Sequence, residues 1–314
     1  MLLENNQLII VDIGASGGID TRWKNLTSYF KCILFEPDPR EYSVLKENSD
    51  SNLIVLNSAL SDSNKTVEFH LCQKQEVSSI FPPNFDLLNK FPDSERFKVQ
   101  KNIRLNTDTL NNQLIKVGVN EVDFIKIDTQ GYELPILQGS YDYLDSVIGL
   151  EIEVEFVEMY KGQPLFDEVD GFVKSKNFSL VDLKRYFWKR KGTGNTTNKK
   201  GQLIFGDALY FKTPEQILAI SNINQEKIIR SIYIYLAYGY VDLSQVLLQE
   251  AKNINLLTEE VFTSLVKTLK KYEKNELGKS FRLRKKISNL LHKLSIIINL
   301  DEDYSFGTDQ KIGN

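Results

Sequence analysis

Short apolar runs alternate with amphipathic segments along the first half of the chain. The segments 39–49 and 134–144 are compatible with helices that bury one face. Strands rich in β-branched residues are predicted at 8–13, 32–36, 52–60, 122–128 and 146–154. This alternation predicts βαβ units, and therefore an α/β fold with a mostly parallel sheet that helices cover on both faces.

Two later runs, 178–188 and 202–212, have no helix between them, so we expect an antiparallel pair that closes the sheet. The runs 66–71 and 101–107 predict one more pair of strands. The stretch between these two runs contains three prolines and no clean period. A long irregular insertion of this kind is usually functional or mobile.

The pattern changes after Thr213, where a Thr-Pro pair predicts the start of a helix. Helices are predicted at 214–221, 225–238, 242–253, 258–274 and 279–297. We therefore divide the chain into an α/β domain (1–212), a helical appendage without chemistry of its own (213–300) and a flexible tail (301–314).

Composition narrows the class of protein. The 314 residues are 41% hydrophobic and 26% charged, with a net charge of −3, which indicates an ordinary globular protein that is not a nucleic-acid binder. Two cysteines exclude a disulfide framework, and Cys32 is predicted to be a buried thiol. Two histidines exclude a histidine-rich metal site and argue against a Ser-His-Asp triad.

With no visible signal peptide and no apolar run of ~20 residues, we expect a cytoplasmic protein without a transmembrane segment.

A glycine-rich turn, Gly14 to Gly18, follows the first strand. Ligands of parallel α/β sheets bind beyond the carboxyl ends of the strands, where this turn lies. The dinucleotide pattern G-x-G-x-x-G fails because Ser16 and Ile19 occupy its second and third glycine positions, and no P-loop pattern occurs. The failed pattern argues against a nicotinamide-dependent oxidoreductase.

An acid, Glu36, ends the second strand, where it can accept hydrogen bonds from both hydroxyls of a ribose. A ligand with a ribose, an amino acid and no phosphate fits the turn and this acid together, and S-adenosylmethionine (SAM) is such a ligand. We expect the N–H groups of the turn to face it. The alternative is a tight turn that only packs a helix against the sheet.

Several motifs together resemble the FkbM-type SAM-dependent methyltransferases. They are VDIGASGG (11–18), FEPDP (35–39), NSALSD (57–62), FIKIDTQGYELPILQG (124–139) and LEIEVEF (150–156). The resemblance covers roughly residues 8–212 and implies a Rossmann-like seven-stranded methyltransferase sheet with a reversed last strand. The family commonly has an acid where this chain has Gln130.

The resemblance also implies cofactor contacts at the ends of four strands. The glycine turn would line the methionine and ribose end, Glu36 would bind the ribose, the turn after the third strand would flank the adenine, and Asp128 would face the methyl group. The implied cofactor-binding residues are Asp12, Gly14, Ala15, Ser16, Gly17, Gly18, Glu36, Pro37, Asp38, Ala59, Leu60, Asp62 and Asp128.

Carboxylates gather at the same predicted edge of the sheet. Asp128 and Glu133 bracket the turn after the fourth strand, and Glu151, Glu153 and Glu155 share one side of the fifth strand because side chains alternate. Such crowding is costly unless the side chains open into a polar pocket or bind something. Asp128, Glu133 and Glu153 are the catalytic candidates, and the carboxylates suit either a general base or a divalent cation.

Two of these carboxylates have simpler interpretations. Glu133 suits the start of the short helix that follows it, where an acid is favourable. Glu151 suits an ion pair with a basic neighbour. No metal is assigned from the sequence.

Residues for an acceptor are predicted beyond the fifth strand. Glu155, Tyr160 and Gln163 can hydrogen-bond an acceptor, although a surface loop is the alternative for the last two. Lys189 and Arg190 lie in a basic segment, 182–200, which suits either an anionic acceptor or a solvated loop. The basic helix predicted at 280–299 suits a membrane surface or, more often, packing on its own domain or on a second copy in a homo-oligomer.

Together these features predict a cytoplasmic SAM-dependent methyltransferase that O-methylates a hydroxyl of a sugar, glycan or similar small metabolite. N-methylation stays open. The rival hypothesis is a non-catalytic module of the same fold that recruits partners through the basic segment and the helical tail.

Overall fold

The computed structural model describes residues 2–4, 6–16, 18, 22–23, 29–49, 51–192, 201–276 and 307–308. The predictions for Gly17, for 193–200, for the helix at 279–297 and for most of the tail lie outside these residues. Within them, the main sheet has the order β11-β9-β10-β8-β7-β1-β2-β3. Its strands are β1 (Leu8–Ile13), β2 (Phe30–Phe35), β3 (Leu53–Leu56), β7 (Phe124–Ile127), β8 (Gly149–Glu155), β9 (Ser179–Trp188), β10 (Gln202–Phe211) and β11 (Gly307–Thr308).

The central strands of this sheet are parallel, as predicted. β1 pairs in parallel with β2 and β7, and the parallel pairing continues from β7 to β8 and from β2 to β3. The seventh strand of this sheet along the chain, β10, lies between β8 and β9 and is antiparallel to both. The predicted antiparallel pair and the reversed last strand are therefore confirmed.

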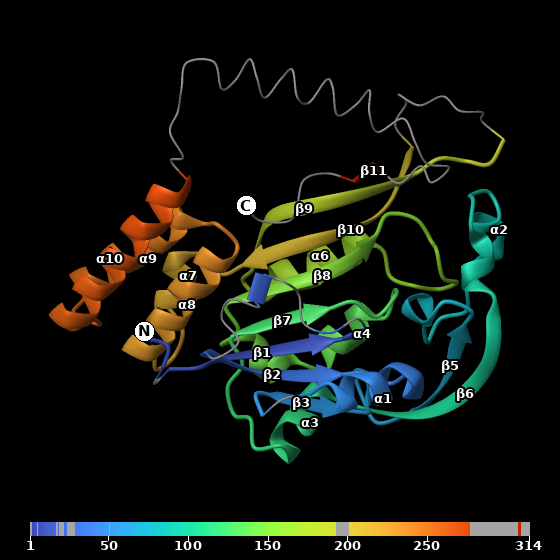
Figure 1. The fold of residues 1–314 in the computed structure, drawn as a ribbon, viewed down its shortest axis with the longest axis horizontal. Helices are drawn as coiled ribbons and strands as arrows, with labels where there is room; N and C mark the ends of the chain where they lie inside the picture. Colours follow the sequence, from blue (N-terminus) through green and yellow to red (C-terminus); the bar gives the residue numbers. More distant parts are fainter. Residues whose placement is uncertain are drawn as a thin grey trace.

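Both faces of the sheet are buried because neighbouring residues of each strand contribute to different cores. In β1, Val11 and Ile13 join the core under α3 (Leu110–Lys116), α4 (Glu133–Gln138), α5 (Tyr141–Leu144) and α6 (Phe166–Ser175). On the other face, Ile10 and Phe124 pack with residues of α1 (Pro39–Glu47) and α8 (Gln225–Ala237). The result is three layers, with helices on both sides of the sheet (Figure 1).

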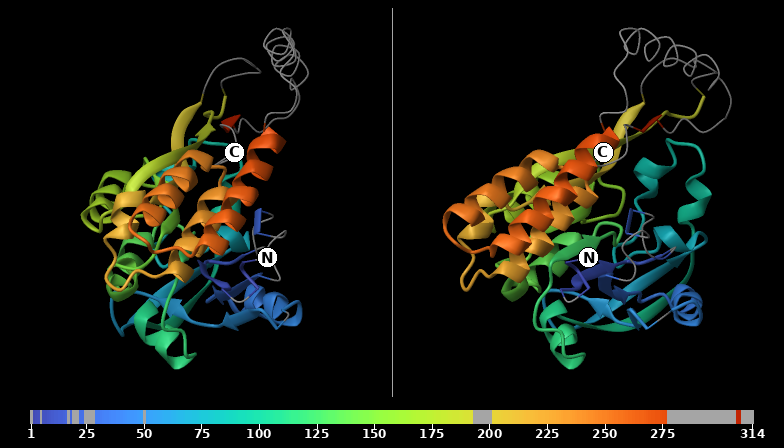
Figure 2. Two further views of the ribbon diagram at one scale, coloured as in Figure 1. Left: turned by 90° about the vertical axis from the view of Figure 1, so that its left-hand side faces the viewer. Right: turned by 60° about the vertical axis from the view of Figure 1, so that its left-hand side comes forward.

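The helices after Thr213 pack onto the sheet. They are α7 (Pro214–Leu218), α8, α9 (Val241–Asn253) and α10 (Glu259–Glu276). One hydrophobic cluster contains Ile232 of α8 together with Phe124, Leu209 and Phe211 of the sheet. Figure 2 shows α8, α9 and α10 lying side by side along this face. Among the described residues, no helix is both long enough and apolar enough to cross a membrane.

The predicted extra strands form a second, three-stranded sheet. β5 (Thr66–Cys72) is antiparallel to β6 (Val99–Asp108), and β4 (Ala59–Leu60) pairs in parallel with β6. The run predicted as one strand at 52–60 is therefore split, because its last two residues leave the main sheet.

The insertion between β5 and β6 is ordered. It contains η2 (Gln75–Val77), α2 (Phe85–Leu88) and η3 (Ser94–Phe97). Phe91 and Phe97 pack against Trp188, at the end of β9, and against Tyr160. This third core fastens the insertion to the carboxyl edge of the main sheet (Figure 1).

Candidate functional site

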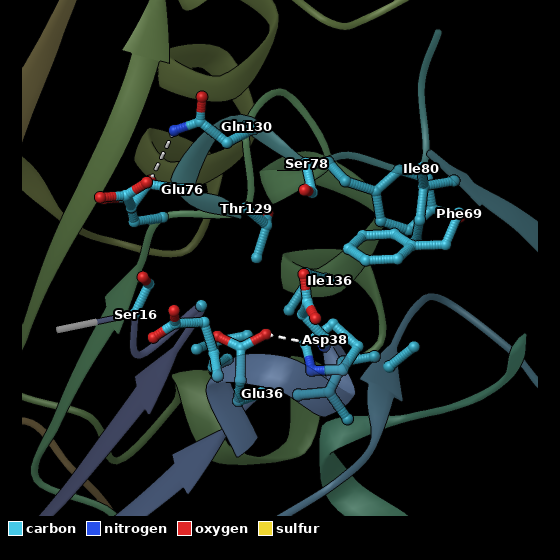
Figure 3. Close-up of a pocket in the computed structure, with 18 of the residues that line it drawn as sticks. Ser16, Glu36, Asp38, Phe69, Glu76, Ser78, Ile80, Thr129, Gln130 and Ile136 are labelled. Carbon is cyan, nitrogen blue, oxygen red and sulfur yellow. Dashed lines mark hydrogen bonds between the residues drawn. The ribbon is translucent and has the colours of Figure 1, made fainter. Parts of the chain in front are cut away.

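A pocket of about 220 Å³ opens at the carboxyl ends of β1, β2 and β7. Figure 3 shows Ser16 and Glu36 on one side of it, with Phe69 and Ile80 across from them. The side chains or backbone that line it belong to Ile13, Gly14, Ser16, Glu36, Pro37, Asp38, Glu41, Ser58, Ala59, Leu60, Phe69, Gln75, Glu76, Ser78, Ile80, Asp128, Thr129, Gln130, Tyr132 and Ile136.

Gly14 allows two strand ends to meet at the floor of this pocket. Its φ is +80°, and a Cβ at this position would lie 1.8 Å from the carbonyl oxygen of Asp128. The N–H of Gly14 donates to the carbonyl of Phe35 at 2.9 Å, and the N–H of Ala15 donates to the same oxygen. Both N–H groups therefore donate hydrogen bonds within the protein. The expectation that they face a ligand is wrong.

The rest of the glycine turn divides between pocket and core. Ser16 lines the pocket, whereas Ala15 is buried in the core and does not line it. The N–H of Gly18 donates to the carbonyl of Ala15 at 2.9 Å, and Gly18 also lies away from the lining. Asp12 does not line the pocket, and its Oδ1 lies 3.5 Å from Nζ of Lys126.

Glu36 has the position predicted for binding a ribose. It is 5% exposed, and its Oε1 accepts a hydrogen bond from the Asp38 N–H at 2.8 Å. Burial raises the pKa of Glu36 to about 8 because the low-dielectric surroundings disfavour its charge. Hydroxyl groups of a ligand would donate hydrogen bonds to this carboxylate and so compensate the cost of its burial. The two hydroxyls of a ribose fit this role.

Asp38 lines the pocket, but its carboxylate serves α1. It caps that helix by accepting from the Arg40 N–H at 2.9 Å, and it forms an ion pair with the Arg40 side chain. The turn after β3 contributes Ala59 and Leu60, as predicted, whereas Asp62 lies outside the lining and pairs with Lys65 at 2.6 Å.

The second sheet and the insertion form the opposite wall. Phe69 of β5 and Ile80 are apolar and lie across from Glu36, with Ser78 beside them, and Gln75 also belongs to the lining. Such a wall suits the face of an adenine ring. The sequence indicated only that this insertion is functional or mobile, because nothing in its irregular pattern shows that it folds back over the ends of β1 and β2.

The charges of the lining disfavour ligands that carry phosphate groups. Within the described lining there are five acidic residues and no lysine or arginine. Phosphate groups are normally bound by cationic side chains or by exposed N–H groups, and the N–H groups of Gly14 and Ala15 are already bonded. The residues therefore fit the ribose, adenine and amino-acid parts of SAM better than a dinucleotide.

The turn after β7 is organised by Gln130, whose φ is +58°. Its side-chain Nε2 donates to Oδ1 of Asp128 at 2.9 Å and to Oε2 of Glu153 at 2.6 Å. Its Oε1 accepts from the hydroxyl of Tyr160 at 2.9 Å. The amide thus holds the pocket carboxylate Asp128 next to β8, a role that an acid at this position could not perform.

The other two catalytic candidates lie behind Asp128. Oε1 of Glu133 accepts from the N–H groups of Thr129 at 2.8 Å and Gly131 at 3.1 Å, so Glu133 tightens the turn from the first residue of α4. Neither Glu133 nor Glu153 lines the pocket. Glu151 bonds Arg22 at 2.9 Å and the Tyr238 hydroxyl at 2.7 Å, which confirms its interpretation as a partner of a basic residue.

The residues predicted to contact an acceptor are mostly used within the protein. Tyr160 is fully buried, and its hydroxyl also donates to the carbonyl of Val77 at 3.0 Å. Gln163, which is 6% exposed, accepts from the Tyr160 N–H. Neither residue belongs to a surface loop, and neither lines the pocket. Lys189 and Arg190 follow β9 outside the lining, where Arg190 donates to Gln202 at 3.3 Å.

The strand order, the reversed β10 and a pocket suited to SAM define a Rossmann-like SAM-dependent methyltransferase. Comparison with known proteins specifies the family. The model of the methyltransferase FkbM domain matches residues 12–180, and the chain belongs to this family.

Two known proteins illustrate the similarity. The chain is 27% identical to the 2-O-methyltransferase NoeI of Sinorhizobium fredii over 172 residues, which are 52% of this chain and 69% of NoeI. Among solved structures it resembles TrmK of M. capricolum in complex with S-adenosylhomocysteine, with 9% identity and a TM-score of 0.30, over 87% of this chain and 94% of TrmK.

Proposed function

We propose that this methyltransferase transfers the methyl group of SAM to a hydroxyl of a sugar, a glycan or a similar neutral polyol, with Asp128 as general base. The observation that carries the proposal is the position of Asp128, which lines the pocket at the end of β7 while Gln130 holds its Oδ1. The similarity to NoeI, a 2-O-methyltransferase, supports a hydroxyl acceptor.

SAM, when bound, supplies a methyl group on a sulfonium, which is a good electrophile. The protein therefore needs to align the acceptor and to accept its proton. The carboxylate of Asp128 would accept the hydroxyl proton while the oxygen bonds to the methyl carbon and the carbon–sulfur bond breaks, with S-adenosylhomocysteine as the leaving group. Gln130 keeps this carboxylate in place through an N–H that carries no charge.

A neutral acceptor suits the charges around the pocket. The described lining carries several carboxylates and no cationic side chain, so an anionic acceptor would be repelled near the reacting atoms. Hydroxyl groups donate hydrogen bonds to carboxylates, so a polyol such as a sugar is favoured.

The test is transfer of label from methyl-tritiated SAM to a panel of mono- and oligosaccharides by the full-length protein. Asp128→Asn should lower kcat by about 100-fold at saturating SAM and acceptor, since a positioned base contributes factors of this size. Asp242→Asn, at an exposed carboxylate in the first turn of α9, is the matched control and should retain full activity.

Two results would contradict the proposal. Label that enters only proteins or nucleic acids would exclude the carbohydrate acceptor. An Asp128→Asn variant with the kcat of the unmodified protein would exclude Asp128 as the base.

A further inference from the structure

Three glutamates converge behind the turn at 129–131. Glu133 comes from the start of α4, and Glu153 and Glu155 come from β8. One carboxylate oxygen from each lies within 4.8 Å of the other two. Glu133 and Glu155 are both 2% exposed, and Glu153 is half-buried. Three carboxylates at this separation repel one another strongly unless a cation or shared protons compensate them.

The protein compensates these charges only in part. N–H groups of the turn bind Oε1 of Glu133, and the side chain of Gln130 binds Oε2 of Glu153. Such donors favour the ionised form of a carboxylate. Within the described residues, none of the three glutamates forms an ion pair with a lysine or arginine.

Glu155 provides an independent sign of a missing partner. Its Oε1 is buried and has no hydrogen-bond partner in the described part of the chain. A buried polar atom is normally satisfied, because leaving it without a partner is costly. Glu155 is one of the three clustered residues, and the nearby amide of Gln163 does not satisfy it, because Nε2 of Gln163 also lacks a hydrogen-bond partner.

We propose that Glu133, Glu153 and Glu155 hold a divalent cation of the Mg²⁺ or Mn²⁺ type. Carboxylate oxygens are the ligands that these hard ions prefer. Softer ions are disfavoured because no histidine or cysteine belongs to the cluster among the described residues. The site would have three protein ligands and leave the remaining positions to water.

The position of this site gives the ion a role next to the pocket. Gln130 donates to both Glu153 and Asp128, so the ion lies one side chain behind the proposed base. A divalent charge there would favour an ionised Asp128 and a developing alkoxide. This role rests on the proposed methyl transfer, whereas the binding of the ion does not.

The test is a titration of the full-length protein with Mn²⁺ alone at pH 7.5, in which the EPR signal of free Mn²⁺ reports binding. We expect one ion per chain with a Kd of at most the order of 1 mM. Glu155→Gln should weaken binding at least tenfold. Glu226→Gln, at an exposed position of α8, should bind as the unmodified protein does.

If the Glu155→Gln variant does not fold, Glu153→Gln is titrated with Mn²⁺ in the same way. In addition, Mn²⁺ should raise the melting temperature of the unmodified protein but not that of Glu153→Gln. If no ion binds, or if both glutamine variants bind Mn²⁺ normally, the cluster shares protons and the proposal is wrong. Because SAM and acceptor are absent, failure of methyl transfer would leave this result unaffected.

Discussion

Glu36 is a buried carboxylate at the end of β2, with one oxygen held by the Asp38 N–H. Its pKa of about 8 reflects burial first, and the nearby acids Asp38, Glu41 and Asp12 add to the effect. The carboxyl group is therefore protonated at neutral pH in the cofactor-free protein. A ribose that donates two hydroxyl protons needs the ionised form, so binding should release a proton.

From this follows a prediction for the pH dependence of cofactor binding. Affinity for S-adenosylhomocysteine should rise between pH 6.5 and pH 8, by at most about tenfold per unit, and level off above pH 8. Calorimetry across this range measures the effect. Glu36→Gln should bind about 10- to 100-fold more weakly at pH 8.5 and show a flat profile. An unchanged slope in that variant would assign the titration to another group.

Gly14 is a second residue on which the site depends. Gly14→Ala should destabilise the protein by roughly 2–4 kcal/mol, because its φ of +80° is unfavourable and its Cβ would overlap the Asp128 carbonyl. Gly118 is the matched control: its φ is +70°, but nothing lies within 4 Å of an added Cβ. Gly118→Ala should therefore cost only about 1 kcal/mol. Urea unfolding checks both values, and equal losses would refute a role for the close contact.

Among the elements, α8 is attached to the sheet by charge as well as by apolar packing. Asp123, which precedes β7 and is fully buried, accepts from Lys227 and Arg230 of α8 at 2.9 Å each. Its other oxygen accepts from the Ile9 N–H at 2.9 Å. One side chain thus joins α8, β1 and β7 at the edge opposite the pocket.

Asp123→Asn should destabilise the protein by about 3 kcal/mol, because it removes the buried one of the two carboxylates that pair with Lys227, the other being Glu121 at 3.0 Å. Lys174→Met breaks the exposed pair between Lys174 and Asp170 and should cost less than about 1 kcal/mol. Chemical denaturation compares the two variants. Similar losses would mean that the buried pair contributes no more than a surface one.

The turn at 129–131 connects the insertion to Asp128. Ser79 donates to the carbonyl of Gln130 at 2.8 Å, and Tyr160 donates both to the Gln130 side chain and to Val77. The insertion therefore serves the cofactor pocket directly, by lining it and by supporting the turn that carries Asp128.

For the molecule as a whole, the helices after residue 212 and the sheet share one hydrophobic cluster. A chain that ends at residue 212 would expose Phe124, Leu209 and Phe211 to water. We expect this fragment to bind a hydrophobic dye and to lose cooperative unfolding. Calorimetry and circular dichroism give the readout. A fragment that melts cooperatively and binds S-adenosylhomocysteine would instead establish 1–212 as a separate domain.

Local patterns were sufficient to predict the described strands of the main sheet except β11, which lies within the segment 301–314 predicted as a flexible tail. Buried parallel strands are short apolar runs, and helices between them have a different period, so both can be recognised within about ten residues. The glycine turn and Glu36 were found for the same reason, since each directly follows a strand. The side of the pocket that contains the glycine turn and Glu36 lies at the carboxyl ends of the strands, as the motifs predicted. Ser16, Ala59 and Leu60 belong to this side.

The sequence by itself therefore determined the class of fold and the cofactor, SAM, and it predicted the edge of the sheet at which the pocket opens. Only the tertiary structure decided how distant residues meet. Gly14 touches Asp128, Gln130 joins two carboxylates and a tyrosine, and the insertion covers the pocket. These contacts join residues far apart in the chain, and their geometry depends on packing, which no local period records.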